Sequence, residues 1–224
     1  MIYNYSMKQN NIEQELFLKL KTYGFKNLSD KNQNGLNFLM FCLKHNNLQK
    51  ILISNVSEWD YLLQNTDLTN QVKPGDFNAF MFSVIYSRSQ KINWTEQQWN
   101  YLIQHTDVTQ KTPDQWNAFM YILKNYDSNP KFIIHKIWEK MSEEQKQETF
   151  QTVCKAYQKK ELHEKDILFT IYDLQFQPNQ STRNYLIEKH HKILQIIENI
   201  NVFFQLNKDL SSQKNNISNL KAKL

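Results

Sequence analysis

The stretch Trp59-Asp-Tyr-Leu-Leu-Gln-Asn-Thr-Asp-Leu-Thr69 recurs 40 residues later as Trp99-Asn-Tyr-Leu-Ile-Gln-His-Thr-Asp-Val-Thr109, with 7 of the 11 positions identical. A second block, Asn78-Ala-Phe-Met81, returns as Asn117-Ala-Phe-Met120 and has an earlier copy in Asn37-Phe-Leu-Met40. Blocks that recur in the same order at one period of roughly 20 to 50 residues are typical of proteins built from stacked units. The chain is therefore predicted to be a repeat protein with units of about 40 residues.

Each unit is predicted to contain two helices. The first begins near the Asn-Ala-Phe-Met block and is expected over residues 77–86 and 116–126. The second begins at a capping-box pattern, Asn55-x-x-Glu58 or Thr95-x-x-Gln98, and carries apolar residues at helical spacing. The chain has only 3 Gly and 4 Pro, which disfavours a sheet-rich fold because tight turns need these residues. We therefore predict an all-α fold, an α-solenoid of stacked helix pairs with a C-terminal helical extension.

Two segments are expected along the chain. Residues 1–178 are predicted to form the solenoid, with a capping helix in 12–35, units at 36–76 and 77–115, and a degenerate last unit at 116–160. In residues 179–224 an apolar residue recurs every seventh position, a pattern typical of a helix that buries one narrow stripe: Ile196, Phe203, Leu210, Ile217 and Leu224. This segment has three alternatives: a coiled coil that forms a homodimer through 196–224, a helix folded back on the solenoid, or a frayed end.

The units resemble the ankyrin repeat over roughly residues 12–140. The block Asp30-Lys-Asn-Gln-Asn-Gly35-Leu-Asn37-Phe-Leu39-Met40 resembles the ankyrin turn and first helix, and Tyr101 to Val108 resembles the end of the ankyrin second helix. Four features differ from the ankyrin pattern. Asp76 and Gln115 replace Gly35, Asn stands where Thr is usual, and Met40, Met81 and Met120 stand where His is usual. The unit is also about seven residues longer. We place the extra residues at 87–93. A HEAT-like helical pair is the alternative, because its length fits better although its motifs fit less well.

The resemblance implies protein recognition through the inner helices and the loop tips, and it implies no catalysis. We expect a concave partner-binding strip made of the residue after each methionine, the residue one helical turn further on, and the lysines at the loop tips: Phe82, Tyr121, Tyr86, Asn125, Lys73 and Lys111. The alternative is that the aromatic members pack between units. Trp59 and Trp99 are predicted to belong to the core between units, and Asp67 and Asp107 to bond nearby backbone amides.

Chemistry-bearing residues form no recognisable constellation in the sequence. The six histidines form no metal pair with cysteine at finger spacing, and no glycine-rich phosphate loop is present. Cys42 and Cys154 are expected to be reduced and buried, as small apolar side chains. We therefore predict no catalytic residues, no metal site and no cofactor, and we do not expect an enzyme.

The distribution of charge indicates which class of partner the protein binds. The net charge is +5, and from Ser181 onward 7 Lys/Arg stand against 3 Asp/Glu, so the surplus is 7 − 3 = +4 in the last segment. Because dedicated nucleic-acid binders cluster their basic residues, we favour a protein–protein interaction scaffold or adaptor, and keep a nucleic-acid-binding HEAT-like solenoid as the alternative.

Location and source are expected from composition alone. No apolar run approaches the roughly 20 residues of a membrane span, and the start lacks a signal-peptide core. We expect a protein that binds no membrane and works in the cytoplasm or is delivered to a host cytosol. The abundance of Asn, Lys and Ile suggests an AT-rich bacterium, and an effector role fits this source.

Overall fold

The computed structural model describes residues 2–45, 53, 56–73, 75–87, 92–125 and 131–202, and the side chains from residue 12 onward. Every regular element among the described residues is a helix, which confirms the all-α prediction; Val72 and Phe77 form an isolated antiparallel bridge. The helices are α1 (Ile2–Thr22), α2 (Phe38–His45), α3 (Val56–Asn65), α4 (Ala79–Tyr86), α5 (Glu96–His105), α6 (Ala118–Lys124), α7 (Lys131–Lys140), α8 (Glu143–Gln158), α9 (Glu164–Tyr172) and α10 (Gln180–Lys189). A further helical stretch covers residues 191–202.

The chain divides into two compact units, unit 1 (Met1–Gln145) and unit 2 (Lys146–Leu224). The boundary lies in the first turn of α8. The division expected at residue 178 rests on the sequence pattern and stays a prediction. Residues 203–224 lie outside the described residues, and with them all the heptad positions except Ile196. None of the described helices is long and apolar enough to cross a bilayer.

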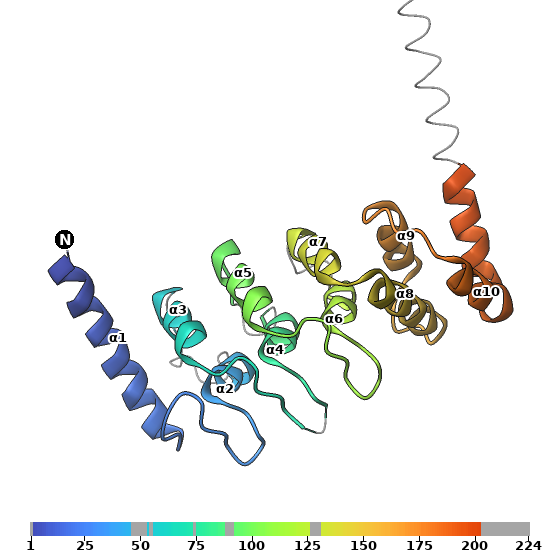
Figure 1. Cartoon of the computed structure of the whole chain (residues 1–224). Helices are drawn as coiled ribbons and strands as arrows, with labels where there is room; N and C mark the ends of the chain where they lie inside the picture. Colours follow the sequence, from blue (N-terminus) through green and yellow to red (C-terminus); the bar gives the residue numbers. More distant parts are fainter. Residues whose placement is uncertain are drawn as a thin grey trace, which may run out of the picture. The chain divides into compact units, whose positions relative to one another are not determined.

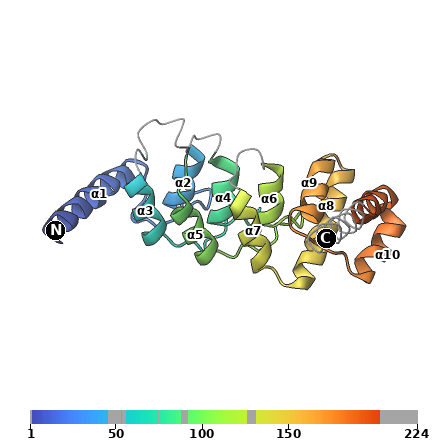
Figure 2. The same cartoon turned by 90° about the horizontal axis from the view of Figure 1, so that it is seen from above.

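Unit 1 has its helices in two rows. α2 packs against α4 and α4 against α6, while α1 packs against α3, α3 against α5, and α5 against α7 (Figures 1 and 2). α4 also contacts α5, and α6 contacts α7, so the two rows face each other. Long loops leave the row of α2, α4 and α6 on one side, as Figure 1 shows.

Asparagine sets where the helices of the α2 row begin. Asn78 and Asn117 take an extended conformation, and their side-chain oxygens accept from the amides of Met81 and Met120. Capping by Asn satisfies one of the free amides of the first turn. The helices therefore begin two residues later than expected, at Ala79 and Ala118 in place of 77 and 116.

The capping box expected at Thr95 is present. The Gln98 amide donates to Thr95 Oγ1 at 3.2 Å, and the Thr95 amide donates to Gln98 Oε1 at 2.9 Å. Asn55, in the matching pattern of the preceding copy, lies outside the described residues. α1 is followed by Gly24, whose φ of +77° is the left-handed conformation that commonly ends a helix.

Tryptophans fill the core between consecutive helix pairs. Trp59 and Trp99 are 7% and 2% exposed, which confirms that they are core residues. The Trp94 ring joins them, with ring centroids 5.1 Å from Trp59 and 5.9 Å from Trp99. Burying one large aromatic side chain stabilises the fold by about 2 to 3 kcal/mol, so this cluster is a major source of cohesion in unit 1.

Candidate functional site

The three loops that precede α2, α4 and α6 each have one residue in the left-handed conformation at a matching position. Gly35, Asp76 and Gln115 have φ values of +74°, +50° and +65° at matching positions. In each loop an amide donates to a carbonyl beyond the turn: Asn32 to Leu36 at 2.9 Å, Val72 to Phe77 at 2.9 Å, and Thr112 to Trp116 at 2.8 Å. Left-handed backbone costs a non-glycine residue roughly 1 to 2 kcal/mol, so these loop contacts outweigh local preference at Asp76 and Gln115.

Two of the capping asparagines also join α2 to the end of α3 and α4 to the end of α5. Besides capping α2, Asn37 donates from Nδ2 to the Asp67 carbonyl at 2.9 Å. Asn78 repeats this contact with the Asp107 carbonyl at 2.7 Å. Each bond joins the start of one helix to the chain just beyond the second helix of the same pair. Asn37 and Asn78 therefore each cap one helix and hold the end of the next one.

The two aspartates at these exits organise their own turns, as expected. Asp67 Oδ1 accepts from the Thr69 amide at 3.0 Å, and Asp107 Oδ1 accepts from the Thr109 amide at 2.9 Å. An Asp that bonds the backbone two residues on fixes a tight turn. The carbonyls that the asparagines reach are therefore held in place.

Consecutive loops are joined to each other. Asn70 Nδ2 donates to the Gly35 carbonyl at 3.3 Å, and Gln110 Nε2 donates to the Asp76 carbonyl at 2.5 Å. In both cases the amide side chain at the start of one loop reaches the left-handed residue of the loop before it. This contact sets the spacing of the loop tips, where Lys73 and Lys111 are exposed.

A chain of aromatic rings runs along α4, its preceding loop and α6, and we name it the aromatic row: Tyr86, Phe82, Phe77, Tyr121 and Trp116. Consecutive ring centroids are 5.4, 6.1, 5.5 and 5.3 Å apart. The Lys124 Nζ lies 5.1 Å from the Trp116 ring centroid, which places an ammonium at one end of the row. Phe77 is the bridge, because it contacts the α4 ring Phe82 and the α6 ring Tyr121.

The residues expected to bind a partner differ in accessibility. Phe82 is 5% exposed, so the expectation that it is accessible is wrong: its ring packs between Phe77 and Tyr86. Tyr86, Tyr121 and Asn125 are half-buried. Asn125 caps the end of α6 and donates from Nδ2 to the Tyr121 carbonyl at 2.8 Å. The aromatic row therefore presents Phe77, Tyr86 and Tyr121 to solvent.

The sequence prediction omitted Phe77 and Trp116. Each is a large aromatic that directly precedes a capping asparagine, and this shared place was the available signal. Phe77 also lies on Gly75, since a Cβ there would fall 2.1 Å from the Phe77 ring. Gly75 therefore leaves the room that the bridging ring occupies.

Tyr121 stays a neutral hydrogen-bonding phenol at physiological pH. Burial raises its pKa, a hydrogen bond with Thr112 lowers the pKa by less than burial raises it, and the charge of Asp114 adds a smaller increase. A neutral hydroxyl beside an apolar ring suits a contact that is part hydrophobic and part hydrogen-bonded.

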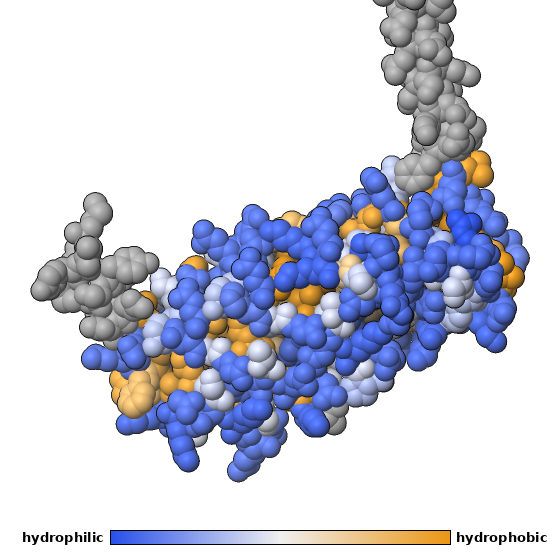
Figure 3. Space-filling view, in the orientation of Figure 1, coloured by the Kyte–Doolittle hydropathy of each residue, from blue (hydrophilic) through white to orange (hydrophobic). Residues whose placement is uncertain are grey.

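The face of unit 1 drawn in Figure 3 is mainly hydrophilic, with smaller apolar patches between the polar side chains.

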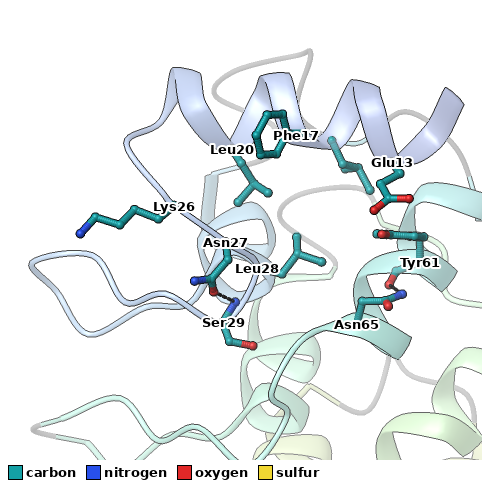
Figure 4. Close-up of a pocket in the computed structure, with 10 residues that line it drawn as sticks. Glu13, Phe17, Leu20, Lys26, Asn27, Leu28, Ser29, Tyr61 and Asn65 are labelled. Carbon is teal, nitrogen blue, oxygen red and sulfur yellow. Dashed lines mark hydrogen bonds between the residues drawn. The ribbon is translucent and has the colours of Figure 1, made fainter. Parts of the chain in front are cut away.

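A separate pocket of about 330 Å³ lies between α1, residues 26–29 and α3 (Figure 4). Its apolar lining comes from Leu16, Phe17, Leu20 and Leu28, and its polar lining from Glu13, Lys26, Asn27, Ser29, Tyr61 and Asn65. Burial raises the pKa of Tyr61, and so do the charge and the hydrogen bond of Glu13. Asn27 and Asn65 already bond to neighbouring groups, so much of the polar lining serves the fold.

The groups that could carry chemistry are separated or buried. No cluster of His, Cys, Asp and Glu among the described residues could hold a metal ion. Cys42 and Cys154 are free and fully buried, and burial raises the pKa of both thiols. The thiols are therefore protonated at physiological pH.

Comparison with known proteins finds no matching family model, no similar curated protein and no similar solved structure. The inference of function therefore starts from the contacts within unit 1.

Proposed function

We propose that unit 1 is an ankyrin-like solenoid that serves as a protein–protein interaction scaffold and binds its partner along the aromatic row. The observation that carries this proposal is the unbroken contact of five rings along α4 and α6, with Phe77, Tyr86 and Tyr121 partly exposed. Tyr, Trp and Phe dominate the energetic centres of protein interfaces.

Rigidity supports the proposal further. An interface loses less affinity to ordering when its side chains are already fixed. The Tyr86 and Tyr121 rings each pack on a neighbouring aromatic, and the asparagine and loop-to-loop bonds fix the backbone beneath them. The exposed Lys73 and Lys111 supply a polar rim of the kind that surrounds an interface core.

The setting of this scaffold is proposed from composition. An adaptor of an AT-rich bacterium, acting in the cytoplasm or as an effector in a host cytosol, fits the sequence. A homodimer through residues 196–224 stays part of the proposal for the C-terminal segment.

The test places a photo-crosslinking phenylalanine at Tyr121 in one variant of the full chain and at Gln104 in another. Gln104 is exposed on α5, in the other row of helices. In extract of the source cell, we expect protein adducts from position 121 and not from position 104. Equal adducts at both positions, or none at 121, would overturn the assignment, and an adduct that nuclease removes would favour the nucleic-acid alternative.

Affinity for the captured partner is then measured on a Tyr86→Ala/Tyr121→Ala double variant. Loss of two interface centres is expected to weaken binding by about thirtyfold or more. Tyr101→Ala is the matched control, because Tyr101 is a half-buried tyrosine on α5 that stacks on His105. If the control loses as much affinity as the double variant, the aromatic row is not the binding surface.

A further inference from the structure

α10 in unit 2 is held to α8 mainly by long polar side chains. Three glutamines on one face of α8 bond to α10 and to the segment before it. Gln147 donates from Nε2 to the Gln177 carbonyl and accepts through Oε1 from the Asn179 amide, both at 3.0 Å. Gln151 Nε2 donates to Thr182 Oγ1 at 3.2 Å, and Gln158 Nε2 donates to the Lys189 carbonyl at 2.8 Å. Within α10 only Thr182 and Leu186 are buried. Apolar burial therefore contributes little to keeping α10 in place.

His190 stands at the joint between α10 and the helical stretch that follows it. Its amide donates to the Leu186 carbonyl at 2.8 Å, and its own carbonyl accepts from the Ile193 amide at 2.9 Å. The side chain is 4% exposed, with Nε2 2.7 Å from the Tyr185 hydroxyl. Nδ1 is buried and has no hydrogen-bond partner among the described residues. One imidazole thus fills the joint with half of its hydrogen-bonding capacity unused.

The surroundings of His190 disfavour a positive charge. Burial lowers its pKa, and the charge of Lys155 on α8 lowers it further. Lys155 is held beside the joint, with Nζ 5.6 Å from the Tyr185 ring centroid. Exposed charged or titratable groups near the joint are Glu188 and Lys189 of α10, and His191, Lys192 and Glu198 of the next helix. Arg183 of α10 and Tyr157 of α8 are half-buried, and Arg183 Nε donates to the Pro178 carbonyl at 3.2 Å. Cys154 on α8 is buried and uncharged.

We propose that His190 is an acid-sensitive latch, and that its protonation releases α10 and the helix at 191–202 from α8. The neutral imidazole packs in the joint and bonds to Tyr185. A second proton creates a buried cation with an unpaired Nδ1–H near an ammonium, a combination that a folded interior tolerates poorly. Release returns the imidazolium to water. Among the described residues, the restraints to break include the glutamine hydrogen bonds from α8 and the packing of Leu186, Ile193 and Ile197.

Cys154 supplies the readout. It is fully buried on α8, directly before Lys155, whose Nζ lies 5.6 Å from the Tyr185 ring centroid of α10. Release of α10 exposes this thiol, whereas Cys42 in unit 1 is equally buried and reports unfolding outside unit 2. The full chain is labelled with 4,4′-dithiodipyridine at pH 7.5 and at pH 5.0, and peptide mass mapping separates the two cysteines. Each rate is divided by the rate in denaturing urea at the same pH.

We expect the normalised labelling rate of Cys154 to rise several-fold at pH 5.0 and to exceed any rise at Cys42, to which the titration of His45 on the same helix contributes. The ordinary histidine pKa near 6.5 sets a ceiling of about thirtyfold at this pH. His190→Gln should remove the rise. His191→Gln, which changes the exposed neighbouring histidine, should keep it.

The proposal is overturned by a rise that persists in His190→Gln, by an equal or larger rise at Cys42, or by the lack of any rise in the unmodified chain. If His190→Gln is already labelled fast at pH 7.5, His190→Leu replaces it under the same criteria, because leucine keeps an apolar group in the joint.

Discussion

Asn78 donates a hydrogen bond from its side-chain Nδ2 to the carbonyl of Asp107 at 2.7 Å, across 29 residues of sequence. The same side chain accepts from the Met81 amide at 3.0 Å through Oδ1, so one residue caps α4 and holds the exit of α5. Asn37 makes the same pair of contacts one unit earlier, with Met40 and Asp67. The side-chain amide of Asn78 thus links α5 to α4, and that of Asn37 links α3 to α2.

Asn78→Ala is expected to lower the free energy of unfolding by about 2 kcal/mol, because it removes a cap worth about 1 kcal/mol and a buried hydrogen bond of similar size. Urea denaturation followed by circular dichroism measures this change. Asn34→Ala is the control, since Asn34 lies exposed in the loop before α2, and its effect should stay below about 0.5 kcal/mol. An equal loss in both variants would contradict the double role of Asn78.

Gln115→Gly is expected to stabilise the protein by up to about 1 kcal/mol. The residue is exposed and has a φ of +65°, where glycine relieves strain that exceeds its extra entropy in the unfolded chain. Gly35→Ala, at the matching position with a φ of +74°, should destabilise by about 1 kcal/mol. Thermal unfolding checks both, and Gln104→Gly inside α5 should cost about 1 kcal/mol as an ordinary helix position.

Lys19 and Glu58 form a partly buried ion pair that joins α1 to α3, with Nζ and Oε1 2.9 Å apart. Glu58 is 1% exposed, so Lys19→Met removes the cation beside a buried carboxylate and should lower the free energy of unfolding by about 2 kcal/mol. Glu58→Gln reproduces the residue found at Gln98 in the next copy and should restore part of this loss in the double variant. A double-mutant cycle in urea measures the coupling, and strict additivity would show that the pair contributes nothing.

His45 at the end of α2 is expected to make unit 1 less stable in acid. Burial lowers its pKa, and the neighbouring Lys44 lowers it further. Because the folded pKa lies below that of the unfolded chain, the unfolded state binds more protons as the pH falls below about 6.5, and stability falls with it. NMR titration should give His45 a pKa below 6.5, and His45→Gln should flatten the loss of stability between pH 7 and 5. An unchanged slope would contradict the assignment.

Local sequence predicted the elements of unit 1 well where one residue decides the backbone near it. Thr95 and Gln98 form the expected capping box. The predicted starts of α4 and α6 are wrong by two residues, because Asn78 and Asn117 cap these helices from an extended conformation and do not belong to them. These errors are small, since a cap acts on the amides of its own first turn.

Accessibility in the candidate site was harder to predict. Phe82 and Tyr121 occupy the same place in their units, yet Phe82 is buried and Tyr121 is half-buried. The difference arises because Phe77, from the loop before α4, lies against both rings, and Tyr86 covers Phe82 from the other side. A periodic pattern places Phe82 on a helix face without showing which loop residue covers it.

The sequence by itself determined the period of about 40 residues, the helical class, the tryptophan core and the turns at Asp67 and Asp107, because recurrence, hydrophobic spacing and capping are local signals. Only the tertiary structure decided that Asp76 and Gln115 take the left-handed conformation of Gly35, that Asn37 and Asn78 reach across their helix pairs, and that five rings join into one row. Each of these depends on contacts between residues far apart in the chain or on a backbone conformation that such contacts impose against local preference.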